Sequence, residues 1–220
     1  MFGSPRVLTA MTFTSTVEMG TCTIAFDERV LTPRPWTLMQ SVWAAELSPD
    51  LPDGPILELC AGAGQIGLVA AVATGRPLVQ VDIDPAACEF ARMNAAHAGI
   101  AERVVVRCEP LEGVTTSNER YPLILADPPY LPSEQVRQWP NDPTRAIDGG
   151  PDGLELIRGC LAVKQSALAA GGIGLLQIAG SGQVDQLIAE LPDDLAVREV
   201  RQFDSVRAVA LIGHRPRARR

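Results

Sequence analysis

The turn Asp127-Pro128-Pro129-Tyr130 follows a short apolar run, Leu123–Ala126, and its composition suits the binding of an amino group. Two successive prolines remove backbone N–H donors and stiffen the turn. What remains is a set of hydrogen-bond acceptors, the Asp127 carboxylate and the Pro128 carbonyl, beside the aromatic face of Tyr130. These acceptors would hold an NH₂ group by both hydrogens and leave its nitrogen directed at an electrophile. The turn therefore predicts chemistry at a planar nitrogen, with its four residues as the catalytic ones.

A second turn, rich in glycine, lies earlier in the chain. The segment from Glu58 to Gly67 reads E-L-C-A-G-A-G-Q-I-G and places G-x-G-x-x-G between an expected strand and an expected helix. Such a turn lets the backbone approach a ligand closely and directs helix N–H groups toward it. Asp82 ends the next strand, twenty residues after Gly62, where a carboxylate reaches ribose hydroxyls. The pattern predicts a nucleoside-containing ligand.

Carboxylates decide which nucleoside ligand is expected. Both a nicotinamide dinucleotide and S-adenosylmethionine would use this geometry. Glu58 is expected to point into the crevice, where its charge would repel a pyrophosphate and attract the ammonium group of a methionine moiety. Glu109, after the third strand, offers an acceptor for the adenine amino group. We expect S-adenosylmethionine, with S-adenosylhomocysteine as product, and keep an NAD-binding oxidoreductase or a non-catalytic adaptor as remote alternatives. The residues expected to bind the cofactor are Glu58, Cys60, Ala61, Gly62, Gly64, Asp82, Ile83, Glu109 and Pro110.

The two turns must be positioned by elements that alternate along the chain. Short apolar runs typical of strands are followed by segments with apolar residues at helical spacing. This alternation predicts an α/β fold, a doubly wound, Rossmann-like, seven-stranded and mostly parallel sheet that binds ligands at the carboxyl ends of its strands. The last two strands are expected to form an antiparallel hairpin at one edge. The expected strands are Pro55–Leu59, Leu78–Val81, Val104–Arg107, Leu123–Ala126, Gly172–Ile178, Ala196–Arg201 and Val206–Ile212, and the expected helices are Gln65–Thr74, Pro85–Ala98, Gly153–Ala169 and Gln183–Glu190.

The first fifty residues are expected to form a small unit of their own. Two β-prone runs, Thr21–Phe26 and Arg29–Leu31, flank Asp27-Glu28 and predict an N-terminal β-hairpin. Thr37–Leu47 has apolar residues at helical spacing. We divide the chain into 1–50, a hairpin and helix packed on the catalytic domain, 51–213, the cofactor-binding domain, and 214–220, a basic tail that we expect to be disordered.

One connection is unusually long. Leu131–Asp152 holds six proline or glycine residues and shows no periodicity, so we expect a structureless loop with a functional role. We assign Arg145 and Asp148 of this loop to acceptor binding, together with Pro33 and Arg34. For the two arginines, exposure without a ligand is the alternative. Asn94 is expected on the surface of its helix.

The net charge and the cysteine content argue against two kinds of ligand, nucleic acids and metal ions. The net charge of -7 and pI near 4.9 have the wrong sign for a phosphate-backbone binder, so a nucleic acid partner is not expected. Five cysteines without a C-x-x-C pair fit reduced thiols in a cytoplasmic protein and argue against a metal site. No apolar run reaches the roughly 18 residues needed to span a bilayer.

The motifs together resemble a known family. Class I methyltransferases acting on planar NH₂ nitrogens carry [N/D]-P-P-[Y/F/W] at this strand end. Within them, residues 20–190 are similar to the HemK/PrmC-type protein-glutamine N5-methyltransferases. The similarity rests on the P-R-P-x-T segment 33–37, the glycine turn, the run 81–85, the D-P-P-Y turn, and the stretch A-I-D-G-G-P-D-G-L at 146–154. The resemblance implies a glutamine side-chain amide in a translation-related protein as methyl acceptor, and a loop that closes one wall of the active site.

Two departures from the family pattern affect the substrate. Only about fifty residues precede the glycine turn, so the chain resembles a short, single-domain form without a helical substrate domain. The glutamine enzymes usually have Asn where this chain has Asp127. Aspartate is common there in enzymes that methylate base amino groups, so a nucleobase in RNA or DNA stays an alternative acceptor. A small amine or amide metabolite is a third.

Overall fold

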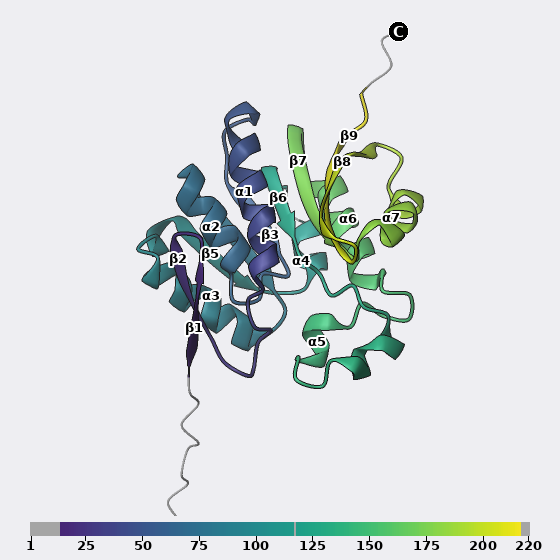
Figure 1. The fold of residues 1–220 in the computed structure, drawn as a ribbon. Coiled ribbons are helices and arrows are strands. Elements are labelled where there is room, and N and C mark those ends of the chain that lie inside the picture. The colour runs from purple at the N-terminus through teal and green to yellow at the C-terminus, as the bar shows by residue number, and fades with distance from the viewer. Residues whose placement is uncertain (1–13, 117, 217–220) are drawn as a thin grey trace, which may run out of the picture.

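The computed structural model describes residues 14–116 and 118–216 and contains a seven-stranded sheet flanked by helices (Figure 1). The strand order is β5-β4-β3-β6-β7-β9-β8. Neighbouring strands from β5 to β7 run parallel, and β9 runs antiparallel to both β7 and β8. The predicted fold class is confirmed. The sheet strands are β3 (Ile56–Leu59), β4 (Leu78–Asp82), β5 (Val104–Cys108), β6 (Tyr121–Ala126), β7 (Leu168–Ile178), β8 (Leu195–Asp204) and β9 (Arg207–His214).

Helices cover both faces of this sheet, because each central strand is apolar on both sides. Alternate residues of β6 show this division. Leu123 and Leu125 face one core with α1, α2 and α3, while Ile124 and Ala126 face the other with α4, α6 and α7. The helices are α1 (Leu38–Leu47), α2 (Gln65–Thr74), α3 (Pro85–His97), α4 (Leu111–Thr115), α5 (Thr144–Ile147), α6 (Glu155–Ala167) and α7 (Val184–Glu190).

The N-terminal hairpin exists, but its turn lies elsewhere than expected. β1 (Ser15–Met19) pairs antiparallel with β2 (Cys22–Phe26), and Gly20-Thr21 form the two-residue turn. Gly20 has φ +59°, which a hairpin turn requires and glycine adopts at no steric cost. The strand expected at Arg29–Leu31 is wrong, because Asp27 accepts hydrogen bonds from the backbone and side chain of Arg29 and folds the chain into a local turn.

The long connection also differs from expectation. It contains a 3₁₀ helix, η4 (Ser133–Gln138), and the short helix α5, so it is structured. The expected tail begins inside the sheet, since His214 is the last residue of β9. The Arg215 backbone N–H also donates to the Asp194 carbonyl. Residues 217–220 of that tail lie outside the described residues.

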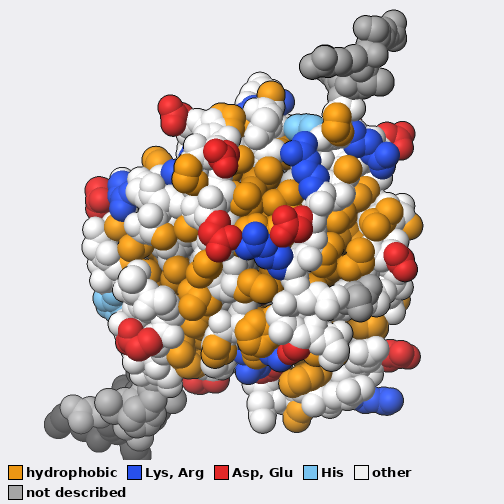
Figure 2. Space-filling model, turned by 45° about the horizontal axis from the view of Figure 1, so that its top comes forward, with side chains coloured by type: hydrophobic (Ala, Val, Ile, Leu, Met, Phe, Trp, Pro, Cys, Tyr) orange, Lys and Arg blue, Asp and Glu red, His pale blue; other side chains and the backbone are white. Residues whose placement is uncertain are grey.

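The face shown in Figure 2 has no basic stripe. Arginine and carboxylate side chains are interspersed there among apolar ones. Among the described residues, Arg201 of β8 pairs with Glu46 at 2.6 Å and with Glu199 at 2.9 Å. Paired charges of this kind do not make a strong phosphate-binding surface.

Candidate functional site

The topology brings three carboxylates to one edge of the sheet. β3 lies between β4 and β6, and all three run parallel, so their carboxyl ends are adjacent. Glu58, Asp82 and Asp127 stand at or beside these ends, and the charges of Asp82 and Asp127 both raise the pKa of Glu58. The strand order reverses between β3 and β6, which is where doubly wound sheets bind ligands. The three carboxylates therefore lie at the edge of the sheet where this fold class binds ligands.

Glu58 does not point into the crevice as predicted. Its side chain is buried, with the residue 2% exposed, and it lies beneath the glycine turn. Its Oε1 accepts the Gly67 backbone N–H at 2.9 Å, and its Oε2 accepts the Gln80 side-chain amide at 2.6 Å. Burial raises the pKa of Glu58 to about 7. The carboxylate holds the start of α2 against β4.

Glycine is required at Gly64 and Gly67 for a different reason than at Gly62. A side chain at Gly67 would collide with Glu58, and one at Gly64 with the Gln80 amide. Gly62, with φ +55°, faces open space: apart from its two chain neighbours, no atom of residues 14–116 and 118–216 lies within 4 Å of the position that a Cβ would take. Close approach is therefore possible at Gly62, while Gly64 and Gly67 serve internal packing.

Asp82 is the anchor of the turn on the ligand side. Its Oδ2 accepts the Gly62 N–H at 2.8 Å and its Oδ1 accepts the Asp84 N–H at 2.9 Å. Burial raises the pKa of Asp82, and these backbone donors oppose that rise. Ile83, next in sequence, is 57% exposed, and the Glu109 N–H donates to the Asp82 carbonyl at 3.1 Å. A carboxylate, an exposed apolar side chain and a second acid therefore lie together.

The remaining predicted cofactor residues divide by exposure. Ala61 and Gly64 are buried within the turn, and Cys60 is only partly exposed. Pro110, after β5, is exposed next to Glu109. Six of the nine residues are partly or fully exposed: Cys60, Gly62, Asp82, Ile83, Glu109 and Pro110.

Asp127 lies at the end of β6 and differs from the other two carboxylates in its lack of partners. Within residues 14–116 and 118–216, no donor hydrogen-bonds to its side chain, although it is partly buried. Burial raises the pKa of Asp127 to about 7. Burial also raises the pKa of Tyr130, with the Asp127 charge adding to the effect. A carboxylate without donors next to an aromatic side chain is an acceptor for an incoming N–H group.

The segment Asp148–Gly153 packs directly on the D-P-P-Y turn. Leu131 forms a β-bridge with Asp148, and the Gly149 N–H donates to the Leu131 carbonyl at 2.8 Å. A Cβ at Gly149 would meet the Pro129 carbonyl, and one at Gly153 the Tyr130 carbonyl. The loop thus forms a wall behind the turn. Asp148 itself accepts from Ser133 Oγ at 2.7 Å and from the Gly150 N–H, so it shapes the loop.

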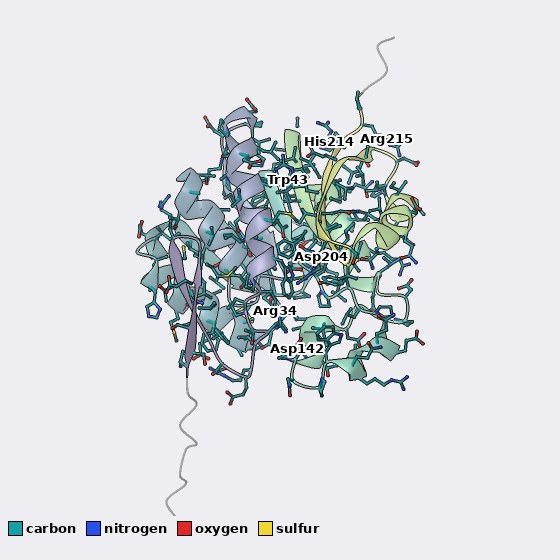
Figure 3. The ribbon with its side chains drawn as sticks, viewed as in Figure 1. Arg34, Trp43, Asp142, Asp204, His214 and Arg215 are labelled. Atoms are coloured by element: carbon teal, nitrogen blue, oxygen red, sulfur yellow. The ribbon has the colours of Figure 1, made fainter. Side chains whose placement is uncertain are left out.

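The P-R-P segment is tied to the same loop by an ion pair. Arg34 Nη2 lies 2.6 and 2.7 Å from the two carboxylate oxygens of Asp142, and Figure 3 shows these side chains together beside α5. Arg34 also stacks near the Trp36 ring, which Arg207 of β9 covers from 3.9 Å. Pro33 is buried and Arg145 is exposed. Arg34 therefore lies near the site, whereas Arg145 has no described partner in residues 14–116 and 118–216.

Three buried amides support the site and were not assigned to it from the sequence. Gln40 of α1 donates to the carbonyls of Ala126 and Leu175, and so holds the strand end just before Asp127. Asn94 is fully buried, contrary to the surface position expected for it, and joins β2 to the glycine turn through the Ala63 carbonyl. Gln80 joins Glu58 to the Gly64 carbonyl. In the sequence, the only indication of such a buried, hydrogen-bonded amide is a glutamine or asparagine within a strongly apolar run.

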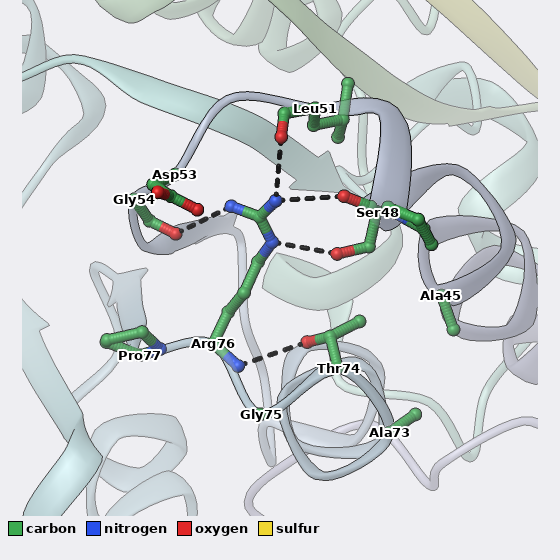
Figure 4. Close-up of a pocket in the computed structure, with 11 residues that line it drawn as sticks. Ala45, Ser48, Leu51, Asp53, Gly54, Ala73, Thr74, Gly75, Arg76 and Pro77 are labelled. Carbon is green, nitrogen blue, oxygen red and sulfur yellow. Dashed lines mark hydrogen bonds between the residues drawn. The ribbon is translucent and has the colours of Figure 1, made fainter.

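A separate hollow of about 620 Å³ lies at the opposite end of the sheet, around Arg76 (Figure 4). The guanidinium donates to Ser48 Oγ and to four backbone carbonyls. All the donors of the Arg76 guanidinium are therefore used within the protein. They tie the segment that precedes β4 to the linker between α1 and β3. The four accepting carbonyls belong to Ser48, Leu51, Pro52 and Gly54.

No cluster of side chains suited to a metal ion occurs within the described ranges, 14–116 and 118–216. Among the helices of that same part of the chain, none has the length and apolarity to cross a bilayer.

Comparison with known proteins shows what the chain is similar to. Residues 41–139 match the family model of the methyltransferase small domain. The fold of the chain is that of class I methyltransferases: a ribosomal protein L11 methylase from Lactobacillus delbrueckii subsp. bulgaricus superposes with a TM-score of 0.64. That match covers 91% of this chain and 99% of the methylase at 13% sequence identity, so it is a likeness of fold.

Sequence relatives of this methyltransferase domain agree with the predicted family. A ribosomal protein uL3 glutamine methyltransferase of Bradyrhizobium diazoefficiens is 34% identical over 76% of this chain. A release factor glutamine methyltransferase of Mycolicibacterium smegmatis is 34% identical over 71% of it. The chain spans only 56% and 57% of the lengths of these two relatives. The resemblance to the glutamine N5-methyltransferases is confirmed at the level of sequence.

Proposed function

We propose that this protein is an S-adenosylmethionine-dependent N-methyltransferase that acts on a glutamine side-chain amide of a translation-related protein. The observation that carries the proposal is the Asp127 carboxylate, which receives no hydrogen bond from the described residues and stands at the end of β6. It adjoins a glycine turn whose neighbourhood is acidic. An acceptor without a donor, next to a site that favours a positively charged ligand, suits methyl transfer to an NH₂ group.

The residues at the glycine turn fit the cofactor. Gly62 leaves open space over the turn, and the exposed Ile83 offers an apolar surface for a purine. Asp82 keeps lone pairs for ribose hydroxyls, and Glu109 lies beside it. Above about pH 7, where Glu58 and Asp127 ionise, the combined charge of these two groups and Asp82 would attract a sulfonium and repel a pyrophosphate. S-adenosylmethionine supplies an electrophilic methyl group when it is bound.

The D-P-P-Y turn would prepare the acceptor nitrogen. An amide nitrogen is a poor nucleophile because its lone pair is delocalised into the carbonyl group. Asp127 and the Pro128 carbonyl would accept the two N–H hydrogens and orient the nitrogen, while Tyr130 would cover the amide plane. The ionised form of Asp127 would also stabilise the positive charge that develops on nitrogen as the methyl arrives, and could then take the proton.

The relatives indicate the acceptor class. Those that match most of this chain are named for glutamine in ribosomal protein uL3 or in release factors. Because this chain spans little more than half of their length, the acceptor is carried over as part of the proposal. We place the protein in the cytoplasm, where such acceptors are found.

The test is methyl transfer to candidate acceptors. The purified full chain would be incubated with radiolabelled S-adenosylmethionine and, separately, with release factor, uL3, a release factor whose acceptor glutamine is replaced by alanine, and total transfer RNA. We expect label in one of the two unmodified proteins and mass spectrometry that places one added methyl group on a glutamine. Label in RNA alone would contradict the glutamine assignment, and failure to bind S-adenosylhomocysteine in calorimetry would contradict the cofactor assignment.

A further inference from the structure

The tip of the β8–β9 hairpin lies at the same end of the sheet as Asp127. Ala126 of β6 pairs with Leu176 of β7, and Leu176 pairs with Ala210 of β9. Asp127 is the next residue after Ala126. Arg207 lies three residues beyond Ala210 in the same direction, because β9 runs antiparallel to β7. The hairpin tip therefore stands at the carboxyl end of the parallel strands, with β7 between it and the end of β6.

Arg207 is held by a carboxylate of the same tip and lies close to two aromatic rings. Its Nε donates to Asp204 Oδ2 at 2.8 Å, and its Nη2 donates to the same oxygen. Asp204 Oδ1 accepts the Val206 backbone N–H at 2.9 Å, so this carboxylate both closes the hairpin turn and orients the arginine. The guanidinium carbon is 3.9 Å from the centre of the Trp36 ring and 5.0 Å from the centre of the Phe203 ring.

A second guanidinium approaches the same tryptophan. The Arg34 guanidinium carbon is 5.7 Å from the centre of the Trp36 ring, and Arg34 Nη2 donates to both carboxylate oxygens of Asp142. Figure 3 shows Arg34, Asp142 and Asp204 in one region of the molecule. Two arginines from segments far apart in the chain, each held by its own carboxylate, therefore meet at one ring.

Arg34, Trp36 and Arg207 form what we call the arginine–tryptophan surface, and it adjoins the D-P-P-Y turn. All three side chains are partly exposed, and Phe203 at its margin is 52% exposed. Burial raises the pKa of Tyr130, and the charges of Arg207 and Arg34 oppose that rise. An acceptor bound at the D-P-P-Y turn would therefore lie within reach of this surface.

The arginine–tryptophan surface has hydrogen-bond donors that the protein does not use. Within residues 14–116 and 118–216, no group accepts a hydrogen bond from Arg207 Nη1, from Arg34 Nε or Nη1, or from Trp36 Nε1. Asp127 lacks a donor, whereas this surface lacks acceptors. A peptide that contains glutamine offers both, because its side-chain amide carries N–H groups and its backbone carries carbonyl oxygens.

The charge of this surface favours a peptide over a nucleic acid. Arg34 is paired with Asp142 and Arg207 with Asp204, so these four groups together carry no net charge. Binding to a phosphate backbone depends on cations that are free to neutralise it. A guanidinium that is already paired with a carboxylate still donates hydrogen bonds from its other N–H groups to neutral carbonyl oxygens.

We propose that the arginine–tryptophan surface binds the peptide backbone beside the acceptor glutamine and so selects a protein acceptor over a nucleic acid. The free N–H groups of Arg207 and Arg34 donate to backbone carbonyl oxygens of the acceptor. The Trp36 and Phe203 rings contact the apolar parts of the acceptor side chains next to the glutamine. This inference rests on the proposed function, since it requires a protein acceptor.

The experiment measures methyl transfer by the full chain to release factor and to uL3 over a range of acceptor concentrations. The test variant combines Arg207→Gln with Asp204→Asn, which removes both charges of the pair and keeps an oxygen for the Val206 N–H. We expect KM for the protein acceptor to rise roughly tenfold, as for loss of a hydrogen bond from a charged group, with a much smaller change in kcat. Affinity for S-adenosylhomocysteine in calorimetry should be unchanged, which also shows that the variant is folded.

Arg201→Met is the matched control for this variant. Arg201 also pairs with carboxylates and lies 4.2 Å from the centre of a tryptophan ring, but that ring belongs to Trp43, which is 0% exposed and closed to a ligand. This control should leave KM and kcat unchanged. Trp36→Ala should raise KM a few-fold, and Trp36→Phe, which keeps an aromatic ring, should not.

Three outcomes would overturn the inference. The first is methyl transfer to a protein with the same KM in the Arg207 variant and in Arg201→Met, which overturns the inference and leaves the proposed function standing. The second is binding of a fluorescein-labelled oligoribonucleotide to the unmodified chain, measured by anisotropy, that the Arg207 variant loses, because the surface would then bind phosphate. The third is an unmodified chain that methylates neither protein, in which case the proposed function fails and the inference fails with it.

Discussion

The two ends of the sheet hold charged side chains of opposite character. At the amino end, Arg76 donates to Ser48 Oγ and to four backbone carbonyls, so its charge is fully engaged by the protein. At the carboxyl end, Asp127 receives no hydrogen bond from residues 14–116 and 118–216, and burial raises its pKa to about 7. The amino end has a hollow of about 620 Å³, yet the Arg76 charge beside it has no donor left for a ligand.

This difference suggests a way to tell a charged side chain that stabilises the fold from one that binds a ligand. A partly buried charge with all its partners stabilises the fold, and removing it costs stability. A partly buried charged group without hydrogen-bond partners destabilises the folded state. Such groups are found at functional sites, where a ligand supplies the missing partner. Arg76 and Asp127 should therefore respond oppositely to substitution, and the predictions below test that contrast from the largest effect to the smallest.

Asp127→Ala should have the largest effect of the substitutions. It should reduce methyl transfer without changing cofactor affinity. We expect methyl transfer to decrease roughly 10²–10³-fold, the range for loss of one polar group aimed at the reacting centre. Affinity for S-adenosylhomocysteine should stay nearly unchanged, because Asp127 faces the acceptor. Single-turnover transfer and calorimetry measure the two quantities. Asp127→Asn is the matched control, which keeps one carbonyl acceptor and should retain partial activity. Full activity in the alanine variant would remove the D-P-P-Y turn from the mechanism.

The pH profile should reflect the raised pKa of Asp127. The folded state keeps a proton that the unfolded chain releases near its ordinary pKa of 3.8. The Asp127 contribution to folding stability is therefore greatest below pH 3.8 and is lost as the pH rises to about 7. Methyl transfer should increase through pH 7 as the carboxylate ionises, and Asp127→Asn should flatten that rise. Glu58 titrates in the same window, so the stability profile should flatten only in part. A rise in activity that persists in Asp127→Asn would assign it to another group.

Arg76→Met should affect stability and leave the chemistry intact. Hydrogen bonds to a charged group contribute more than neutral ones, and we expect the free energy of unfolding to fall by about 2–3 kcal/mol. Denaturant unfolding measures this loss. Transfer per folded molecule should match that of the unmodified chain, since the guanidinium lies at the opposite end of the sheet. Reduced transfer by a fully folded variant would contradict the separation of the two ends.

Asp82→Ala should weaken cofactor binding by about 1.5–3 kcal/mol, the cost of losing a hydrogen bond to a charged group. The same change removes the acceptor of the Gly62 N–H, so the turn should also become less ordered. Calorimetry with S-adenosylhomocysteine measures the affinity. Asp84→Ala is a control on the neighbouring acid, which caps α3 through the Ala86 N–H. Equal affinity in Asp82→Ala and the unmodified chain would refute the role of Asp82 at the ribose.

Arg34→Gln should have the smallest effect. The Arg34–Asp142 ion pair is partly exposed, and such pairs contribute up to about 1 kcal/mol. We expect faster amide hydrogen exchange in residues 131–147 and an increase of a few-fold in KM for the protein acceptor, with kcat nearly unchanged. Arg145→Gln, in the same loop but without a described partner in residues 14–116 and 118–216, should change neither quantity. Equal exchange in both variants would show that the ion pair does not hold the loop.

The sequence predicted the carboxylates at the carboxyl end of the sheet but not the arginine at the amino end. Asp127 and Asp82 could be found because each follows an apolar strand and stands in a recognisable turn. Arg76 could not, because its partners are backbone carbonyls of a linker, and carbonyls leave no mark in the side-chain pattern. Glu58 was assigned to the ligand, but strand direction alone does not tell on which side of the turn a carboxylate lies. Its burial with Gln80 decided that.

The sequence by itself determined the fold class, the family and the positions of the two turns, because these depend on local periodicity and on glycine and proline at fixed spacings. The sequence pattern placed the hairpin turn at Asp27-Glu28, whereas the pairing of β1 with β2 places it at Gly20-Thr21. Tertiary structure alone decided that Asn94 and Gln40 are buried and that Arg34 pairs with Asp142. These contacts join segments far apart in the chain, and their energies depend on distance and burial that no local pattern contains.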